Sequence, residues 1–288
     1  MPGIKKKILV TGSTGFIGKN LTEQLQLSYD TFSPTSKQLD LLDENQVKKY
    51  LLKNKFDIVL HCATHNGTKV SNKDLSLVFK NNLKMFFNLT RCYNLYKRMF
   101  YFGSGAEYDM RNYIPKMKED YFDSHVPVDD YGFSKYIMAK YIKNIPNIYD
   151  LRLFGVYGKY EDWRIRFISQ SICQVISNKD IIINQNVFFD YLYIDDLIKI
   201  IKLLIEKRTI LPQHINVCTG KTIDLISLAK IVIDISGKKL KIKTKEKGLK
   251  KEYSGNNNKL LKTIGNFKFI QIEQSITELY NWYKNNEV

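Results

Sequence analysis

The stretch Thr11–Gly18, with the sequence TGSTGFIG, decides the fold of this chain. It follows an apolar segment, Ile8–Val10, and it opens a helical pattern, Asn20–Leu25. A strand, a glycine-rich turn and the start of a helix together form a pyrophosphate site, because backbone N–H groups and the helix dipole attract the anion and glycine lets the backbone approach it. The alternative is an ordinary tight turn. The strand before the turn and the helix after it favour the pyrophosphate site.

The composition is that of a globular protein. The 288 residues are 44% hydrophobic, enough for one large α/β domain or a pair of domains. No apolar run is long enough to span a bilayer, and the short run after Lys5–Lys7 is too brief for a signal peptide. We therefore expect a cytoplasmic protein that binds neither a membrane nor a metal. The four scattered cysteines suit a reducing compartment: Cys62, Cys92, Cys173 and Cys218.

The net charge of +16 raises the possibility of nucleic-acid binding. The densest basic cluster, Lys238–Lys245, alternates like an edge strand with its charges outward, and no nucleic-acid module accompanies it. We therefore expect no nucleic-acid partner. Solvated helix faces, or attraction of an anionic substrate, explain the charge better.

Strand and helix patterns alternate along the chain, which predicts an α/β fold with a Rossmann-type doubly wound parallel sheet. We expect a dinucleotide-binding domain over residues 1–156 and a smaller C-terminal α/β substrate lobe over residues 157–288, with residues near 187–217 able to pack back on the first domain. The predicted strands are Lys7–Val10, Tyr29–Phe32, Ile58–His61, Met99–Gly103, Ile148–Leu153 and Ile181–Ile183. The predicted helices are Ile17–Leu27, Glu44–Leu52 (with Asp43 as N-cap), Leu75–Tyr96, Tyr131–Lys143, Ile165–Ser177, Leu197–Ile205, Ile226–Ile235 and Ile276–Tyr283.

Tyr131 and Lys135 lie four residues apart in the sequence YGFSK, so that on a helix they share a face. A phenol, with an ordinary pKa near about 10, transfers protons poorly at neutral pH unless a nearby positive charge stabilises its anion. Upstream, the apolar strand Met99–Gly103 ends in a small polar turn that begins with Ser104. Ligands sit at the carboxyl ends of strands in a doubly wound sheet, so Ser104 is expected to face the same pocket as Tyr131. Taken singly, each is ordinary helix surface or loop.

Together these motifs resemble the extended short-chain dehydrogenase/reductase family, of the NAD-dependent epimerase/dehydratase type. Ser104, Tyr131 and Lys135 match its Ser/Thr–Tyr–Lys triad, and Asn82 and Asp195–Asp196 match its helix asparagine and its late strand-to-helix motif. The resemblance implies a nicotinamide dinucleotide, a nucleotide-sugar substrate reacting at C4, and a role in polysaccharide biosynthesis. We also expect a homodimer. The expected cofactor-binding residues are Gly12, Thr14, Gly15, Phe16, Ile17, Gly18, Ser33, Lys37, Asp40, Leu41, Cys62, Ala63, Tyr131, Lys135, Phe154 and Val156.

The chain departs from several branches of this family. Its dehydratases carry an Asp-Glu pair after the catalytic Thr, and Gly105 and Ala106 stand at those positions here. GDP-L-fucose synthase, which the segment Phe32–Asp43 resembles, adds a cysteine, matched here by Ala106, and a histidine, absent from the loop Gly158–Arg164. Acids for water elimination and groups for C3/C5 epimerisation are therefore not visible.

The end of the second strand bears on the choice of cofactor. An acid there binds the ribose 2′-hydroxyl of NAD and repels the 2′-phosphate of NADP. The segment carries Ser33 and Lys37 and no acid at its tip, because Asp30 lies too early, although a short slip in register would change that. We favour NADP(H), with NAD(H) as the alternative.

The substrate residues expected are Ser104, Gly105, Arg164, Arg166 and Lys247. The family's late Arg-Asp pair, whose arginine holds the substrate diphosphate, is Phe189-Asp190 here. We therefore expect Arg164 or Arg166, near the start of a helix, or Lys247, in a tail loop, to supply that charge.

Three functions remain open at this stage. The first is NADPH-dependent reduction of a 4-keto nucleotide sugar, with Ser104 binding the carbonyl oxygen, Tyr131 donating the proton and Lys135 binding the ribose. The second is an NAD-dependent C4 epimerase. The third is a redox sensor that binds the dinucleotide without turnover, which an intact Ser–Tyr–Lys set disfavours.

Overall fold

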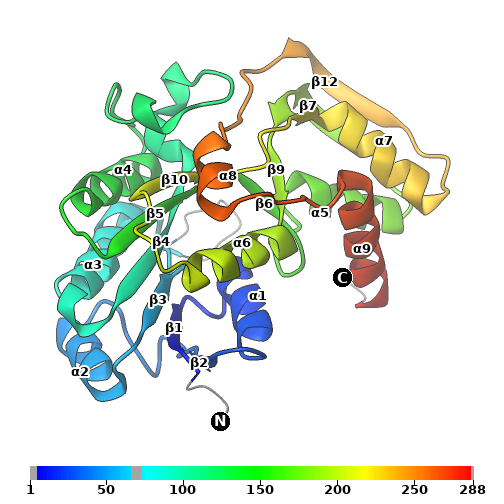
Figure 1. Ribbon diagram of the computed structural model, residues 1–288. Coiled ribbons are helices and arrows are strands. Elements are labelled where there is room, and N and C mark those ends of the chain that lie inside the picture. Colours follow the sequence, from blue (N-terminus) through cyan, green and yellow to red (C-terminus); the bar gives the residue numbers. More distant parts are fainter. Residues whose placement is uncertain (1–4, 66–72, 287–288) are drawn as a thin grey trace. The chain divides into compact units, whose positions relative to one another are not determined.

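The computed structural model describes residues 5–65 and 73–286, which form two compact units (Figure 1). The first unit comprises Met1–Asn112, Glu119–Leu153 and Lys202–Ile215. The second comprises Tyr113–Lys118, Phe154–Ile201 and Asn216–Val288.

The first unit is built around a six-stranded sheet with the order β10-β5-β4-β3-β1-β2. The pairs β1–β2, β1–β3, β3–β4 and β4–β5 are parallel. The chain adds β2 on one side of β1 and then β3, β4 and β5 on the other side. The doubly wound parallel sheet predicted from the sequence is therefore confirmed, and its topological switch point adjoins β1. The strands are β1 (Lys7–Thr11), β2 (Asp30–Phe32), β3 (Ile58–His61), β4 (Arg98–Ser104), β5 (Ile148–Leu153) and β10 (His214–Val217).

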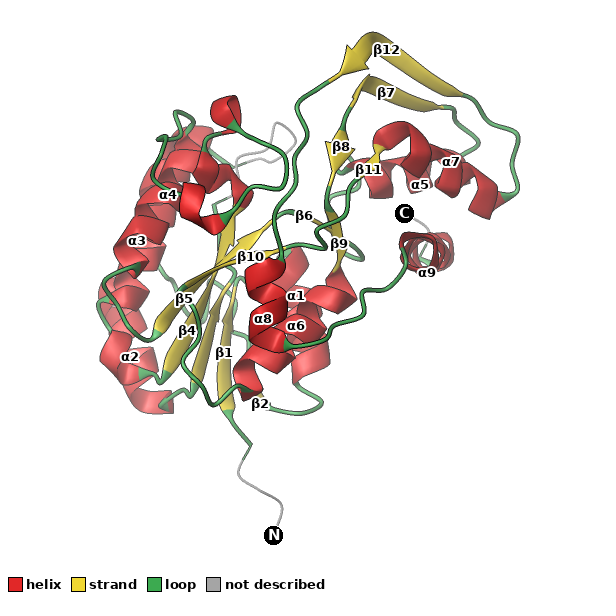
Figure 2. Cartoon of the chain, turned by 45° about the horizontal axis from the view of Figure 1, so that its top comes forward, coloured by secondary structure: helices red, strands yellow, loops and turns green. Residues whose placement is uncertain are grey.

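Helices cover both faces of this sheet (Figure 2). On one face α2, α3 and α4 enclose an apolar core that includes Val59 and Met99 from the sheet and Val47, Phe86 and Ile142 from the helices. Burial of such side chains is the main favourable term in folding. The helices of the unit are α1 (Phe16–Leu25), α2 (Glu44–Asn54), α3 (Val78–Thr90), α4 (Asp130–Ile142) and the last turn of α6 (Ile194–Glu206). Short 3₁₀ turns are η1 (Leu75–Leu77), η2 (Tyr93–Leu95), η3 (Gly105–Tyr108), η4 (Met110–Asn112) and η5 (Glu119–Tyr121).

Two local predictions are settled by hydrogen bonds. Asp43 caps α2 as expected, because its carboxylate accepts the N–H groups of Asn45 and Gln46. The single helix predicted over residues 75–96 is wrong in extent, because α3 ends at Thr90. There the Cys92 N–H donates to the Leu89 carbonyl, three residues earlier, which is a tighter turn than the α-helix, and the Tyr96 hydroxyl donates to the same carbonyl at 3.1 Å.

The second unit combines small sheets with helices. β6 (Gly155–Tyr157) and β9 (Tyr191–Tyr193) pair in parallel, as do β7 (Ile181–Asn186) and β12 (Ile242–Leu249), whereas β8 (Phe188–Phe189) and β11 (Ile223–Asp224) are antiparallel. Lys247, predicted in a loop, lies in β12, because the alternating lysine pattern extends past Lys245. The helices are α5 (Phe167–Ile176), α7 (Leu225–Ser236), α8 (Asn258–Ile264), α9 (Ile272–Asn285) and the first turns of α6.

Candidate active site

The glycine turn after β1 can accommodate only glycine at two positions. Gly12 has φ of +68°, and a Cβ there would lie 2.7 Å from the backbone of Ala63. A Cβ at Gly18 would lie 2.2 Å from the Gly12 carbonyl oxygen. The turn, the loop after β3 and the first turn of α1 are therefore in close backbone contact.

The start of α1 is open to an anion. Gly15 is its N-cap, so no side chain caps the helix, and the first turn carries no acid. The amide groups of this turn and the positive end of the helix dipole fit a pyrophosphate. Gly15 and Thr14 are exposed, and Phe16 and Ile17 are half-buried. These residues suit a dinucleotide.

The tip of β2 carries hydroxyls and a lysine but no acid. Asp30 pairs with Lys7 at the start of the strand, two residues before Phe32 ends it. The Ser13 hydroxyl donates to the Ser33 carbonyl at 3.1 Å, which ties the glycine turn to this tip, and Lys37 is exposed beyond it. Asp30 is thus not at the carboxyl end of the strand.

The other cofactor-binding residues expected in this unit are Asp40, Leu41, Cys62 and Ala63. Leu41 is buried, and Asp40 accepts the Leu42 N–H at 2.9 Å. Cys62 and Ala63 follow β3 directly, in a loop that Asn82 of α3 holds by accepting the His65 N–H at 2.7 Å. The asparagine matched to the family therefore positions the loop after β3.

Tyr131 and Lys135 share the start of α4, as their spacing predicted. Asp129 caps this helix by accepting the Gly132 N–H at 2.8 Å. The Lys135 ammonium donates to the Phe102 carbonyl at 2.7 Å and lies 5.8 Å from the centre of the Tyr131 ring. Lys135 is buried and Tyr131 is half-buried.

Ser104 ends β4 beside this helix. A Cβ at Gly132 would lie 3.0 Å from the Ala106 carbonyl oxygen, so the turn after Ser104 contacts the first turn of α4. The Ser104 hydroxyl oxygen accepts the Ala106 N–H at 3.1 Å. With an acceptor position occupied, the hydroxyl is set to donate to a ligand oxygen. Gly105 and Ala106 offer no acid, base or thiol.

A buried ionic network beneath Ser104 was missed by the sequence reasoning. Arg152 and Glu107 are fully buried, and the Arg152 Nε donates to a Glu107 carboxyl oxygen at 2.8 Å and to an Asp150 oxygen at 2.9 Å. The signal that could have found it is the pattern S-x-x-E, Ser104 to Glu107, which is typical of a capping box.

The remaining predicted residues lie in the second unit. Phe154 is buried before β6, and Val156 lies in β6. Arg164 and Arg166 precede α5, and Arg164 forms two hydrogen bonds of 2.8 Å to Asp162. Arg166 and Lys247 are exposed.

Phe189 lies in an aromatic cluster within this unit. Its ring centre is 5.5 Å from that of Tyr191 and 5.7 Å from that of Tyr253, and Tyr253 also contacts Phe154 and Tyr113. The position that carries a phosphate-binding arginine in the family therefore carries an apolar, stacking surface here.

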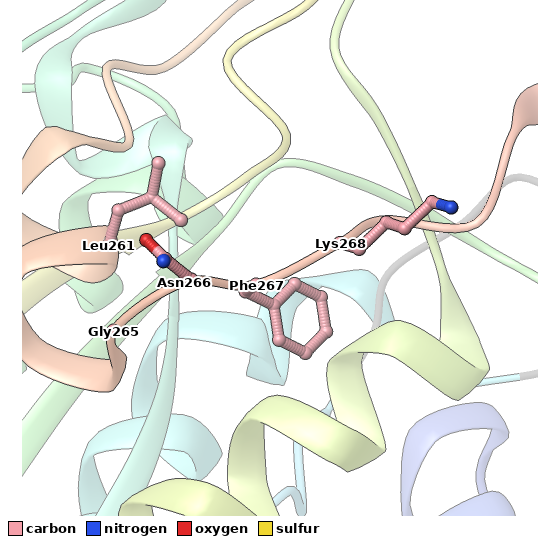
Figure 3. Close-up of a pocket in the computed structure, with 5 residues that line it drawn as sticks. All are labelled: Leu261, Gly265, Asn266, Phe267 and Lys268. Atoms are coloured by element: carbon pink, nitrogen blue, oxygen red, sulfur yellow. The ribbon is translucent and has the colours of Figure 1, made fainter.

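Two cavities lie away from these residues. One of about 500 Å³ in the second unit involves the end of α8 and the segment after it (Figure 3). Another, in the first unit, includes Lys6, Arg98 and Arg208. Neither contains a predicted site residue, and the first holds a single charged side chain, Lys268.

Neither a metal-binding cluster nor a membrane-spanning helix is found in the part of the chain that the structure describes. Within residues 5–65 and 73–286, no group of three or more His, Cys, Asp or Glu side chains is placed to hold a metal ion. Over the same part of the chain, no helix has the length and apolar content that crossing a membrane requires.

Comparison with known proteins shows the family and the fold of this chain. The family model "NAD dependent epimerase/dehydratase family" matches residues 8–218. GDP-L-colitose synthase of Yersinia pseudotuberculosis is 25% identical over 98% of this chain and 99% of its own length. UDP-glucose 4-epimerase of Thermotoga maritima, solved with UDP-glucose, has a TM-score of 0.83 at 19% identity, covering 98% of this chain and 100% of that one. GDP-mannoheptose C4 reductase of Campylobacter jejuni, with NADP bound, has a TM-score of 0.82 at 20% identity, covering 97% and 98%.

The two solved structures establish likeness of fold, and the family model covers most of the chain, including the glycine turn and the Ser–Tyr–Lys residues. The chain belongs to the NAD-dependent epimerase/dehydratase family of extended short-chain dehydrogenases/reductases, and it is an NAD(P)-dependent oxidoreductase.

Proposed function

We propose that this protein reduces a 4-keto nucleotide sugar to the 4-hydroxy sugar with NADPH. The observation that carries the proposal is the juxtaposition of Ser104, Tyr131 and Lys135 at the end of β4 and the start of α4, next to Gly105 and Ala106, which offer no acid or thiol. In the bound state, the reduced nicotinamide supplies the hydride.

The three side chains have distinct tasks in this reaction. Ser104 donates a hydrogen bond to the substrate carbonyl oxygen and stabilises the charge that develops there. Tyr131 gives its phenolic proton to the same oxygen. Lys135, fixed by the Phe102 carbonyl, holds a positive charge beside the Tyr131 ring and favours the phenolate that proton transfer leaves.

The turn after Ser104 favours reduction over elimination or ring epimerisation. Water elimination needs an acid and a base beside the reacting carbons, and C3/C5 epimerisation needs a pair of proton-transfer groups. Gly105 and Ala106 can supply neither, and Glu107 is fully buried on Arg152. GDP-L-colitose synthase, one of the relatives that the chain matches over nearly its whole length, supports a nucleotide-sugar substrate.

The preference for NADPH rests on the tip of β2. Ser33 and the exposed Lys37 follow the strand, while Asp30 is held at its start by pairing with Lys7. A 2′-phosphate at the tip meets hydroxyls and a cation in place of a carboxylate.

The second unit is proposed as the substrate lobe. Arg164, Arg166 and Lys247 are its candidates for the substrate diphosphate, while the aromatic cluster around Phe189 offers stacking surface. The homodimer and the cytoplasmic location stay predictions, to be measured by sedimentation and by cell fractionation.

The direct test is a substrate screen. Purified protein is mixed with NADPH and 4-keto sugars carried on GDP, CDP, UDP or dTDP, and absorbance at the NADPH band is followed together with product identity. We expect stoichiometric NADPH oxidation with at least one 4-keto sugar. Tightly bound NAD in the purified protein, with C4 epimerisation of a UDP-sugar and no net NADPH consumption, would replace this proposal by the epimerase. If no sugar nucleotide supports NADPH oxidation, and a protein partner binds only the oxidised or only the reduced cofactor complex, the redox-sensor function would be favoured.

A further inference from the structure

Glu107 is anchored to the backbone of Ser104. Its Oε1 accepts the Ser104 N–H at 2.9 Å, while the Ser104 hydroxyl oxygen accepts the Ala106 N–H, so the two residues form a reciprocal capping box around η3. The Glu107 side chain therefore fixes the peptide unit that carries the proposed substrate-binding hydroxyl.

Arg152 holds Glu107 from the neighbouring strand. Its Nε donates to Glu107 Oε2 at 2.8 Å, and its Nη1 donates to the Tyr108 hydroxyl at 2.8 Å. The guanidinium also stacks 4.2 Å from the centre of the Phe122 ring. An arginine with several hydrogen bonds in a fixed plane is more rigid than a lysine, so Glu107 is held on both carboxyl oxygens.

Asp150 completes the network beside Gly103, the residue before Ser104. A Cβ at Gly103 would lie 2.1 Å from Asp150 Oδ1 and 2.4 Å from Glu107 Oε1, so the two carboxyl groups meet directly beneath the residue before Ser104. Asp150 Oδ2 lies 2.9 Å from Arg152 Nε and 3.1 Å from His214 Nδ1, but Oδ1 has no hydrogen-bond partner.

The two buried carboxyl groups share the Arg152 guanidinium, because its Nε donates to both of them. Burial, and then the charge of Asp150, raise the pKa of Glu107 well above its ordinary range. Burial opposes ionisation of Asp150 as well, but Arg152 and His214 outweigh it and lower the pKa of Asp150. The cost of a second buried negative charge beside Asp150 therefore falls on Glu107, while Asp150 is the carboxyl group that Arg152 and His214 stabilise as an anion.

We propose that Glu107 is a positioning residue of the active site, which acts through Ser104 by fixing its backbone so that the Ser104 hydroxyl is presented to the substrate as a donor. This inference rests on the proposed role of Ser104, and it assigns a buried acid to the reaction without contact between that acid and substrate.

The test uses Glu107→Gln in the full-length protein. A carboxamide of the same shape has a single oxygen, so it cannot accept from both Ser104 N–H and Arg152 Nε. The matched control is Tyr108→Phe, which removes one bond to Arg152 and leaves the Ser104 anchor intact. Thermal unfolding of both variants reports any shared loss of stability.

The first readout needs no substrate. Hydrogen exchange measured by mass spectrometry should show faster exchange in the peptide that contains the Ser104 and Ala106 amides for Glu107→Gln, and unchanged exchange there for Tyr108→Phe. Unchanged exchange of this peptide in Glu107→Gln overturns the inference, whichever substrate the enzyme uses.

The second readout is catalytic coupling, measured with any nucleotide sugar that the wild type reduces or epimerises. Glu107→Gln should lower kcat by about 10- to 100-fold, because it misplaces a charge-stabilising donor. In a Ser104→Ala background, Glu107→Gln should lower kcat by less than about twofold, since the hydroxyl through which Glu107 acts is already absent. Equal losses in both backgrounds show a general structural role and contradict the inference. Absence of turnover in the wild type contradicts the proposed function alone, and the exchange experiment then decides the positioning role.

Discussion

Tyr131 and Lys135 occupy one face of α4, but their surroundings differ. Lys135 is buried and bound to the Phe102 carbonyl, whereas Tyr131 stays half-buried beside it. A fixed ammonium behind a more accessible phenol is the order that proton delivery to a bound substrate requires.

At the scale of a residue, Tyr131→Phe removes the proton donor and keeps the ring. We expect kcat to fall by about 10²- to 10⁴-fold while NADPH binding changes little. Steady-state kinetics and fluorescence titration with NADPH measure the two effects. Tyr136→Phe is the matched control, because the Tyr136 hydroxyl on the same helix binds Asp123, and it should retain turnover. A kcat of Tyr131→Phe equal to that of the wild type would contradict the assignment of Tyr131 as the proton donor.

At the scale of an element, the tip of β2 is the proposed determinant of the choice between NADPH and NADH. Ser33→Asp places a carboxylate where the 2′-phosphate is proposed to lie, so the ratio of kcat/KM for NADPH to that for NADH should fall at least about tenfold, or about 1.4 kcal/mol. Ser36→Asp adds the same charge at an exposed position of the following turn and should change this ratio less. An unchanged ratio in Ser33→Asp would place the 2′-phosphate elsewhere.

The segment before α5 is the proposed diphosphate grip. Arg164 is held by Asp162, and Arg166 is exposed two residues later. We expect alanine at one of these positions, or at Lys247, to raise KM for the sugar nucleotide by about 10- to 100-fold with little change in kcat, since such a charged hydrogen bond contributes about 1.5–3 kcal/mol to ground and transition states alike.

Arg91→Ala is the control for this series, because it also removes an exposed arginine: Arg91, at the end of α3, forms an ion pair with Glu44 of α2. If all three candidate positions tolerate alanine with unchanged kinetics, the grip lies elsewhere or the substrate lacks a diphosphate.

At the scale of the whole molecule, Glu161 makes stability depend on pH. Burial raises the pKa of Glu161 from its ordinary 4.5 to about 7, with the Ser169 hydroxyl as a hydrogen-bond partner at one oxygen and none at Oε2. The folded chain thus favours the protonated acid. Its contribution to stability is complete below about pH 4.5 and is lost as the pH rises through about 7.

Glu161→Gln imitates the protonated acid at every pH. The variant should match the wild type near pH 4 and exceed its free energy of unfolding at pH 8 by about 3 kcal/mol, measured by urea unfolding. His61 has the opposite effect, because burial lowers its pKa to about 3 and the folded protein therefore loses stability as the pH falls below 6.5. Comparing the variant with the wild type at equal pH cancels this contribution. Parallel pH profiles for the variant and the wild type would contradict the ionisation assigned to Glu161.

The sequence by itself determined the features that depend on local order. The strand, turn and helix around Gly12–Gly18, the spacing of Tyr131 and Lys135, and the capping of α2 by Asp43 are set by residues close together in the chain. A turn that excludes a Cβ and a helix that repeats every 3.6 residues leave a readable pattern, so the fold class followed from it.

The tertiary structure decided what depends on distant residues. Tyr96 binds the last turn of α3 through the Leu89 carbonyl, and β12 pairs with β7. The network of Glu107, Asp150 and Arg152 is assembled from β5 and the turn that follows the neighbouring strand β4, so its hydrogen bonds follow from burial and parallel register. A short motif identifies a side chain, but only tertiary packing excludes water from it. A charged group without water is stable only when protein groups bind it, so its partners depend on the packing.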